Sequence, residues 1–148
     1  MNKRQLGNSG LKLTTLGIGT WAIGGGDWNF GWGAQDQQSA IAGVVRGIEL
    51  GINWIDTAAV YGAGASEELV GQALKAMGAD CPYVATKCGR INREDGSVFG
   101  RIKRKSVIEE CEASLKRLDV EAIDLYQMHW PDPDEDIEEC WRAMVELK

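Results

Sequence analysis

Three ionisable side chains, Asp56, Lys87 and His129, each stand where a short apolar segment of the sequence ends. Such segments have the composition of buried strands, and parallel strands present their carboxyl ends on one face of a sheet. Tyr61 follows Asp56 by five residues, inside the loop Asp-Thr-Ala-Ala-Val-Tyr-Gly, and can fold back over the same opening. We therefore expect these four side chains to lie together.

A carboxylate, an ammonium ion, a phenol and an imidazole in one place could share a proton-transfer reaction. The carboxylate and the ammonium ion would form a buried pair, and the ammonium ion would stabilise the phenolate of the tyrosine, which makes Tyr61 a usable general acid. His129 could hold and orient a substrate carbonyl oxygen. No metal ion and no covalent nucleophile is needed, but an external hydride donor is.

Each of these residues also has a purely structural interpretation when it is taken alone. Asp56 could cap a turn, and Lys87 could be a solvated lysine at a strand end. His129 could be a hydrogen-bonded core histidine, and Tyr61 could anchor its loop. Because separate strands would bring all of them to one face, the group favours a catalytic site more strongly than any single member does.

The elements that position these residues follow one repeating pattern of strand, loop and amphipathic helix. A hairpin comes first, in which residues 4–6 and 11–13 flank the loop Gly7-Asn8-Ser9-Gly10. The predicted strands are residues 15–18, 53–56, 83–86 and 123–128. The helices after them are predicted to begin near Asp36, Ser66, Ser106 and Asp136.

Local signals support these helices. Glu67 and Glu68 would complement the helix dipole in a first turn, and Ser106 with Glu109 forms a capping-box pattern. The helix after Ser106 is expected to bury one apolar side. Its buried residues are predicted to be Val107, Ile108, Cys111, Leu115 and Leu118.

Successive strand–helix units imply parallel strands joined by right-handed crossovers. Such an α/β sheet could close into a (β/α)₈ TIM barrel or stay open and doubly wound. Ionisable residues at the ends of several strands favour the barrel, because barrel enzymes build their active sites there. The stretch from Gly17 to Ala22 matches a dinucleotide-binding G-x-G-x-x-G/A pattern, but no helix opens within it, so we reject that reading.

The composition and net charge limit the classes of partner that the protein is expected to bind. The chain of 148 residues suits one domain and carries a net charge of −6, which argues against nucleic acid and anionic membranes. We expect no secretion signal in the first ten residues, and no apolar run approaches the ~20 residues of a membrane span. The cysteines lack metal-ligand spacing, so we expect no metal site, reduced thiols and a cytoplasmic location. They are Cys81, Cys88, Cys111 and Cys140.

Several segments resemble the aldo-keto reductase family, in the family's order and over nearly the whole chain. They read LGIGTW, GINWIDTAAVYG, ASEELVGQALK, VATK and SLKRLDVEAIDLYQMHWPD. The resemblance implies that the hairpin plugs the bottom of the barrel and that the catalytic residues are Asp56, Tyr61, Lys87 and His129. Tyr61 would donate the proton, Lys87 held by Asp56 would tune it, and His129 would position the carbonyl group.

The resemblance also implies a cofactor, NADPH, and a small carbonyl compound as substrate. Gly19, Thr20 and Trp21 would lie against the nicotinamide ribose, which Asp56 would also touch. Trp21 and His129 would contact the substrate. The stretch GGGDWNFGWG resembles the branch that contains bacterial members and potassium-channel β subunits.

Length sets the remaining expectations. A (β/α)₈ barrel takes roughly 250 residues, so residues 1–148 would supply the hairpin and the first four units, the N-terminal half of the barrel. Three hypotheses follow: a carbonyl reductase, incomplete in this form; a nucleotide-sensing or scaffolding subunit of the same fold; and a half-barrel that self-associates through exposed sheet edges. The family accepts many aldehydes and ketones, so the resemblance does not identify the substrate. The residues that select NADPH over NADH are expected beyond Lys148.

Overall fold

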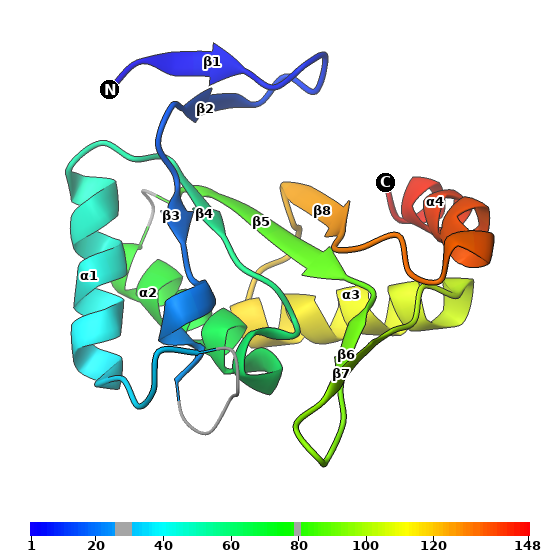
Figure 1. The fold of residues 1–148 in the computed structure, drawn as a ribbon. Coiled ribbons are helices and arrows are strands. Elements are labelled where there is room, and N and C mark those ends of the chain that lie inside the picture. Colours follow the sequence, from blue (N-terminus) through cyan, green and yellow to red (C-terminus); the bar gives the residue numbers. More distant parts are fainter. Residues whose placement is uncertain (26–30, 79–80) are drawn as a thin grey trace.

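The computed structural model describes residues 1–25, 31–78 and 81–148 (Figure 1). The chain opens with the predicted hairpin, in which β1 (Lys3–Gln5) pairs antiparallel with β2 (Lys12–Thr14). The side chain of Asn53, just before the next long strand, accepts from Thr14 N at 2.7 Å and donates to Lys12 O at 2.8 Å. The hairpin is therefore attached at the end of the sheet where the strands begin.

The central sheet is parallel and its strands follow the order of the chain. It contains β3 (Ile18–Gly19), β4 (Trp54–Asp56), β5 (Tyr83–Cys88) and β8 (Leu125–Met128). Each strand pairs with the next, so the order never reverses as it does in doubly wound sheets. This sheet is a segment of a barrel wall.

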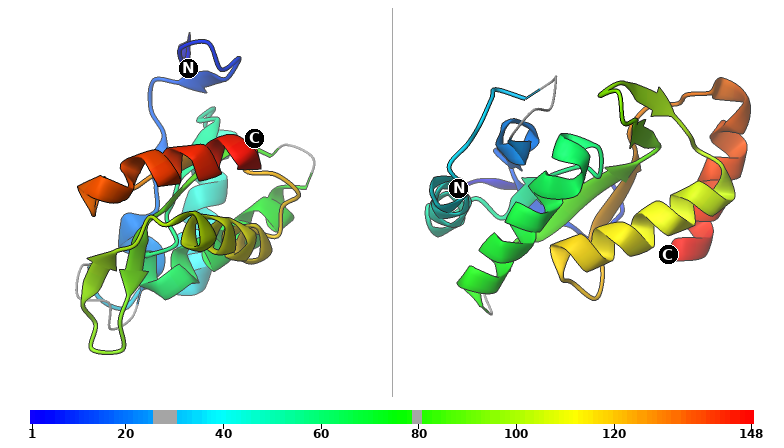
Figure 2. Two further views of the ribbon diagram at one scale, coloured as in Figure 1. Left: turned by 90° about the vertical axis from the view of Figure 1, so that its right-hand side faces the viewer. Right: turned by 90° about the horizontal axis from the view of Figure 1, so that it is seen from below.

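Helices cover one face of the sheet (Figure 2). They are α1 (Gln37–Glu49), α2 (Ala65–Met77), α3 (Arg104–Leu118) and α4 (Ile137–Leu147). Three of the helices are preceded by a short 3₁₀ turn, which lies between the strand and the helix. These turns are η1 (Trp21–Gly24), η2 (Tyr61–Gly64) and η3 (Asp134–Asp136). Because side chains alternate along a strand, Thr86 points to the helices and Lys87 to the opposite face.

Two apolar clusters hold the helices to the sheet. The first packs Ile55 and Val84 against side chains of α1, α2 and α3. The second packs Cys88 of β5 against α3 and α4, and includes Val107 and Cys140. Fully burying a side chain of this size contributes roughly 1.5–3 kcal/mol, so these clusters fix the helices to the strands that carry the polar residues.

Two predicted strands have a wrong boundary: β5 runs on to Cys88 instead of ending at Thr86, and β8 begins at Leu125 instead of Ile123. Two other boundaries are wrong for identifiable reasons. Strand β3 begins at Ile18 rather than Thr15, because the chain bends at Thr15 and Leu16. Gly17 then passes over the ring of Trp54, which lies 2.3 Å from where a Cβ on Gly17 would stand. The expected capping box is also wrong, because α3 begins at Arg104. Ser106 lies inside the helix, and its hydroxyl donates to carbonyl groups of the preceding segment.

Burial along α3 matches the prediction in part. Val107, Cys111 and Leu118 are buried, whereas Ile108 and Leu115 are half-buried. The start of α1 is as expected, since the side chain of Asp36 accepts from Ser39 N at 2.8 Å.

One element has no counterpart in the sequence prediction. Strands β6 (Arg90–Asn92) and β7 (Val98–Gly100) form an antiparallel hairpin directly after β5. Its Asn92 side chain donates to Val60 O at 3.0 Å, which ties the hairpin to the loop that carries Tyr61.

The stretch GGGDWNFGWG, residues 24–33, lies partly outside the described residues, since 26–30 are not among them. Within the described ranges, none of the helices combines the length and the apolar composition that a membrane span requires.

Candidate active site

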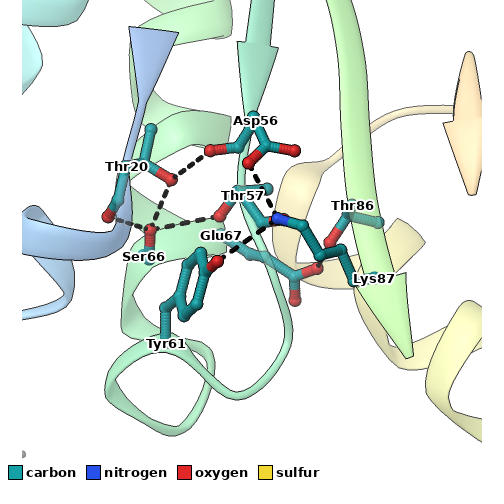
Figure 3. A network of polar contacts seen from close by, with 8 residues as sticks. All are labelled: Thr20, Asp56, Thr57, Tyr61, Ser66, Glu67, Thr86 and Lys87. Carbon is teal, nitrogen blue, oxygen red and sulfur yellow. Dashed lines mark hydrogen bonds and ion pairs between the residues drawn. The ribbon is translucent and has the colours of Figure 1, made fainter. Parts of the chain in front are cut away.

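The ends of β4, β5 and β8 bring together the four side chains that the sequence placed on one face. Lys87 is at the centre (Figure 3). Its Nζ donates to Asp56 Oδ2 at 2.8 Å, to the main-chain oxygen of Thr57 at 2.9 Å and to Tyr61 Oη at 3.3 Å. The three protons of the ammonium group therefore have three acceptors.

The ion pair is shielded without being sealed. The Lys87 side chain is 12% exposed and that of Asp56 is 31% exposed. At intermediate exposure an ion pair interacts more strongly than in bulk water, yet a ligand can still reach it. Lys87 Nζ also lies 5.0 Å from the centre of the Tyr61 ring, so the ammonium ion acts on both the ring and its oxygen.

Tyr61 is held by an unusual turn. Gly62, Ala63 and Gly64 all have positive φ, which bends the chain sharply after the tyrosine. A Cβ on Gly62 would lie 2.1 Å from the main-chain oxygen of Gly24, so glycine is required where this turn meets η1. The turn therefore directs the phenol back toward Lys87.

His129 follows β8 and faces Tyr61. Its main-chain N–H donates to Cys88 O at 3.0 Å, and its ring meets the Tyr61 ring edge-on, with centroids 5.6 Å apart. Burial, and then the nearby charges of Lys87 and Arg90, lower the pKa of His129 to about 4. The imidazole is thus neutral at neutral pH. Its Nδ1 is buried with no hydrogen-bond partner among the described residues.

An open pocket of about 490 Å³ lies against Tyr61 and His129. Most of the residues that line this pocket were not predicted from the sequence. Arg90 and Val98, for example, come from the unpredicted hairpin. Trp130 could have been found, since it directly follows His129. The lining consists of Trp21, Val60, Tyr61, Arg90, Val98, His129 and Trp130. Apolar walls around a phenol and an imidazole suit a small molecule with one polar group.

The residues expected to bind the cofactor differ in how accessible they are. A Cβ on Gly19 would meet no atom within 4 Å, and Trp21 is 39% exposed. With the partly exposed carboxylate of Asp56, they leave open surface beside the pocket. Thr20 is fully buried and its hydroxyl donates to Asp56 O at 3.1 Å, so its side chain is engaged within the protein. Their contacts with a cofactor stay predictions.

A second polar layer lies behind the site, on the helix side of β4 and β5 (Figure 3). Glu67 lies in the first turn of α2, as predicted, and is fully buried there. Its carboxylate accepts from Thr86 Oγ1 at 2.5 Å and from Arg117 Nε at 2.6 Å.

The remaining titratable groups give no sign of metal chemistry in the part of the chain that is described. No group of three or more His, Cys, Asp or Glu there could hold a metal ion. The cysteines are free, and burial raises the pKa of Cys88 to about 12, which keeps it a thiol.

Comparisons with known proteins agree with this geometry. The profile of the "Aldo/keto reductase family" matches residues 15–148. "Aldo-keto reductase YhdN" of Bacillus subtilis is 41% identical over 148 residues, which is 99% of this chain and 43% of that protein. "NADH-specific methylglyoxal reductase" of Escherichia coli is 41% identical over 140 residues, covering 88% of this chain and 42% of that protein.

The fold matches as well. The holo form of "aldo-keto reductase AKR11C1" from Bacillus halodurans superposes with a TM-score of 0.84 at 36% identity, over 100% of this chain and 46% of that one. A "probable voltage-gated potassium channel subunit beta" of Arabidopsis thaliana is 33% identical over 97% of this chain and 42% of that protein. The chain spans less than half the length of these relatives.

Proposed function

Because the chain belongs to the aldo/keto reductase family, we propose that the whole protein is an oxidoreductase that reduces aldehydes or ketones to alcohols with NADPH. The observation that carries this proposal is the position of Lys87, within hydrogen-bond distance of both Asp56 and the phenol of Tyr61. This arrangement builds a proton donor beside an open pocket.

A nicotinamide cofactor, when bound, would supply the hydride that the carbonyl carbon accepts. Tyr61 gives its phenolic proton to the carbonyl oxygen, which becomes the alcohol, and the phenolate later regains a proton from solvent. The ammonium group of Lys87, 3.3 Å from the phenolic oxygen, stabilises the negative charge left on Tyr61. Asp56 balances the charge of Lys87 and holds it in place.

His129 orients the carbonyl group in this scheme. With a pKa of about 4 it is neutral at neutral pH, so it can donate one N–H to the carbonyl oxygen but is a poor source of a proton. This division of roles leaves Tyr61 as the acid and His129 as the positioning donor.

The cofactor and substrate contacts are proposed from the same surface. Gly19, Trp21 and Asp56 would hold the nicotinamide ribose, with the fully buried Thr20 behind them, and Trp21 and His129 would contact the substrate. A pocket of about 490 Å³ with aromatic walls suits small aldehydes and ketones. NADPH is proposed from the resemblance of the sequence to the family, and because the Escherichia coli relative is named NADH-specific, both cofactors must be compared.

A second candidate function is a nucleotide-sensing or scaffolding subunit with little turnover. Its support is the similarity to a probable potassium-channel β subunit. For either function we propose a cytoplasmic protein that binds neither nucleic acid nor membranes, on the acidic net charge of −6. Self-association through the sheet edges at β3 and β8 stays a further proposal, which a sizing column tests.

The experiment uses the whole protein with methylglyoxal or a simple aldehyde and follows consumption of NADPH and of NADH. We expect cofactor oxidation that depends on the carbonyl compound, and transfer of deuterium from a deuterated cofactor to the carbonyl carbon. Tight nucleotide binding without turnover of any carbonyl compound would contradict the reductase and favour the sensing subunit.

A further inference from the structure

Two adjacent residues at the start of α2, Ser66 and Glu67, lie directly behind the active site. Both are fully buried, on the helix side of β4 and β5 (Figure 3). Neither reaches the pocket, and nothing in the proposed reaction uses them. Their contacts nevertheless lead to the two strands that carry Asp56 and Lys87.

Ser66 acts on the end of β4. Its Oγ lies 2.9 Å from the main-chain oxygen of Thr20, 2.8 Å from Thr20 Oγ1 and 3.1 Å from Thr57 Oγ1. Ser66, Thr20 and Thr57 are all fully buried. The hydroxyl of Thr20 in turn donates to Asp56 O. This chain of hydroxyls therefore fixes Asp56 and Thr57, which together provide two of the three acceptors of Lys87.

Glu67 acts on β5. One carboxylate oxygen accepts from Thr86 Oγ1 at 2.5 Å, and the other accepts from Arg117 Nε at 2.6 Å. Thr86 directly precedes Lys87, so Glu67 sets the position of β5 at the residue before the lysine. Arg117 brings α3 into the same contact.

The backbone around Arg117 is shaped for this contact. A Cβ on Gly64 would lie 2.7 Å from Arg117 Cδ, and a Cβ on Gly71 would lie 2.7 Å from Arg117 O. Glycine at both positions lets α3 approach α2 closely enough for the guanidinium group to reach Glu67.

Stability alone does not account for this layer. Apolar residues of similar volume often replace a buried ion pair at no loss of stability, and buried hydroxyls give little net stabilisation even when they are hydrogen-bonded. What such groups provide is a defined geometry, because each buried polar atom must keep its partner.

We propose that Ser66 and Glu67 are positioning residues that fix Lys87 from two sides, Ser66 through Asp56 and Thr57, and Glu67 through Thr86. Lys87 has a long side chain with many rotamers, and the three acceptors hold its ammonium group only if both strands keep their relative position. The inference rests on the proposed function, because turnover is one reporter of where Lys87 lies.

The test compares substitutions in the whole protein. Thr86→Val keeps the side-chain shape and removes the hydroxyl bound by Glu67, whereas Thr86→Ser keeps the hydroxyl. Ser66→Ala tests the other side. Val70→Ala is the matched control, since Val70 is a fully buried core residue of α2 outside the polar layer.

We expect Thr86→Val and Ser66→Ala to lower kcat by about 10- to 100-fold with KM nearly unchanged, since small misplacements of a catalytic group have effects of this size. Thr86→Ser should keep the wild-type kcat. Val70→Ala should lower Tm and leave kcat as it is.

Crystal structures of the variants give a readout that does not depend on turnover. We expect the contact between Lys87 Nζ and Thr57 O to be lost in Thr86→Val and in Ser66→Ala, and kept in Thr86→Ser. Variants that behave like Val70→Ala and keep the Lys87 contacts would overturn the inference. A wild-type protein without turnover would contradict the proposed function instead, and the crystal structures would still decide the inference.

Discussion

Two ion pairs lie on opposite faces of β5 and differ in what surrounds them. One includes Lys87 of the strand, and the other meets the strand at the preceding residue, Thr86. Lys87 and Asp56 face the open pocket, with side chains 12% and 31% exposed. Arg117 and Glu67 lie on the helix side, where Glu67 is fully buried and bound to Thr86 of the strand.

The difference in burial assigns different tasks to the two pairs. A partly exposed pair can reorganise its hydrogen bonds when a ligand arrives, because water and ligand atoms replace lost partners at low cost. A buried carboxylate has no such replacement, so the partners of Glu67 are fixed for as long as the protein is folded. The first pair suits chemistry and the second suits the positioning of strands.

The largest effect is expected for activity in Lys87→Met. Tyr61 would lose the charge that stabilises its phenolate, and loss of a tuned general acid typically costs ~10²–10⁴-fold in rate. Stability should fall by only about 1–2 kcal/mol, because the carboxylate of Asp56 is partly exposed and water can replace the lysine. Steady-state kinetics and thermal melting measure the two effects, and unchanged activity would make Lys87 an ordinary strand-end lysine.

The opposite pattern is expected for Arg117→Met. Glu67 would lose its ion partner in a buried site, which costs roughly 3–5 kcal/mol of unfolding free energy. Activity per folded molecule should fall less than in Lys87→Met. Arg142→Met is the control, since its ion pair with Glu138 is mostly exposed, and such pairs contribute ~0–1 kcal/mol. Equal melting temperatures for both variants would contradict the contrast between the pairs.

A double substitution sharpens the comparison. Glu67→Leu with Arg117→Met replaces the buried pair by apolar groups, which should recover most of the stability lost in Arg117→Met. If Glu67 positions β5, the turnover number should stay below that of the wild type even when melting is restored. Recovery of both quantities together would show that the pair serves stability alone.

A smaller, pH-dependent effect is expected at Glu110 of α3, a buried carboxyl that binds the main chain just after β5, at Gly89. One oxygen accepts from Gly89 N at 2.9 Å, and the other has no hydrogen-bond partner among the described residues. Burial raises the pKa of Glu110 from 4.5 to about 7. The folded protein thus binds this proton more tightly than the unfolded chain, a contribution present below pH 4.5 and lost as pH rises through 7.

Glu110→Gln removes this titration and keeps an acceptor for Gly89. The pKa shift from 4.5 to about 7 is about 2.5 units, and each unit corresponds to about 1.4 kcal/mol, so the variant should be more stable than the wild type above pH 7 by on the order of 3 kcal/mol. Below pH 4.5 the two proteins should differ little. Chemical denaturation at both pH values measures this, and equal stability of the two proteins above pH 7 would contradict the assignment.

The sequence predicted the strand ends well because buried parallel strands read as apolar runs, and an ionisable residue after such a run stands out. It missed the hairpin β6–β7, whose short strands are half-buried and lack an apolar run. It placed Glu67 correctly in the first turn of a helix but did not reveal that the side chain is buried. The ion-pair partner of Glu67 is Arg117, which comes fifty positions later in the sequence. Only the fold reveals this contact.

The central claim is that Tyr61 donates the proton, and Tyr61→Phe tests it most directly. The substitution keeps the ring against His129 and removes only the hydroxyl. In the whole protein we predict a loss of carbonyl reduction of ~10²–10⁴-fold, with unchanged nicotinamide binding measured by fluorescence titration. Near wild-type turnover in Tyr61→Phe, with the cofactor bound normally, would contradict the account.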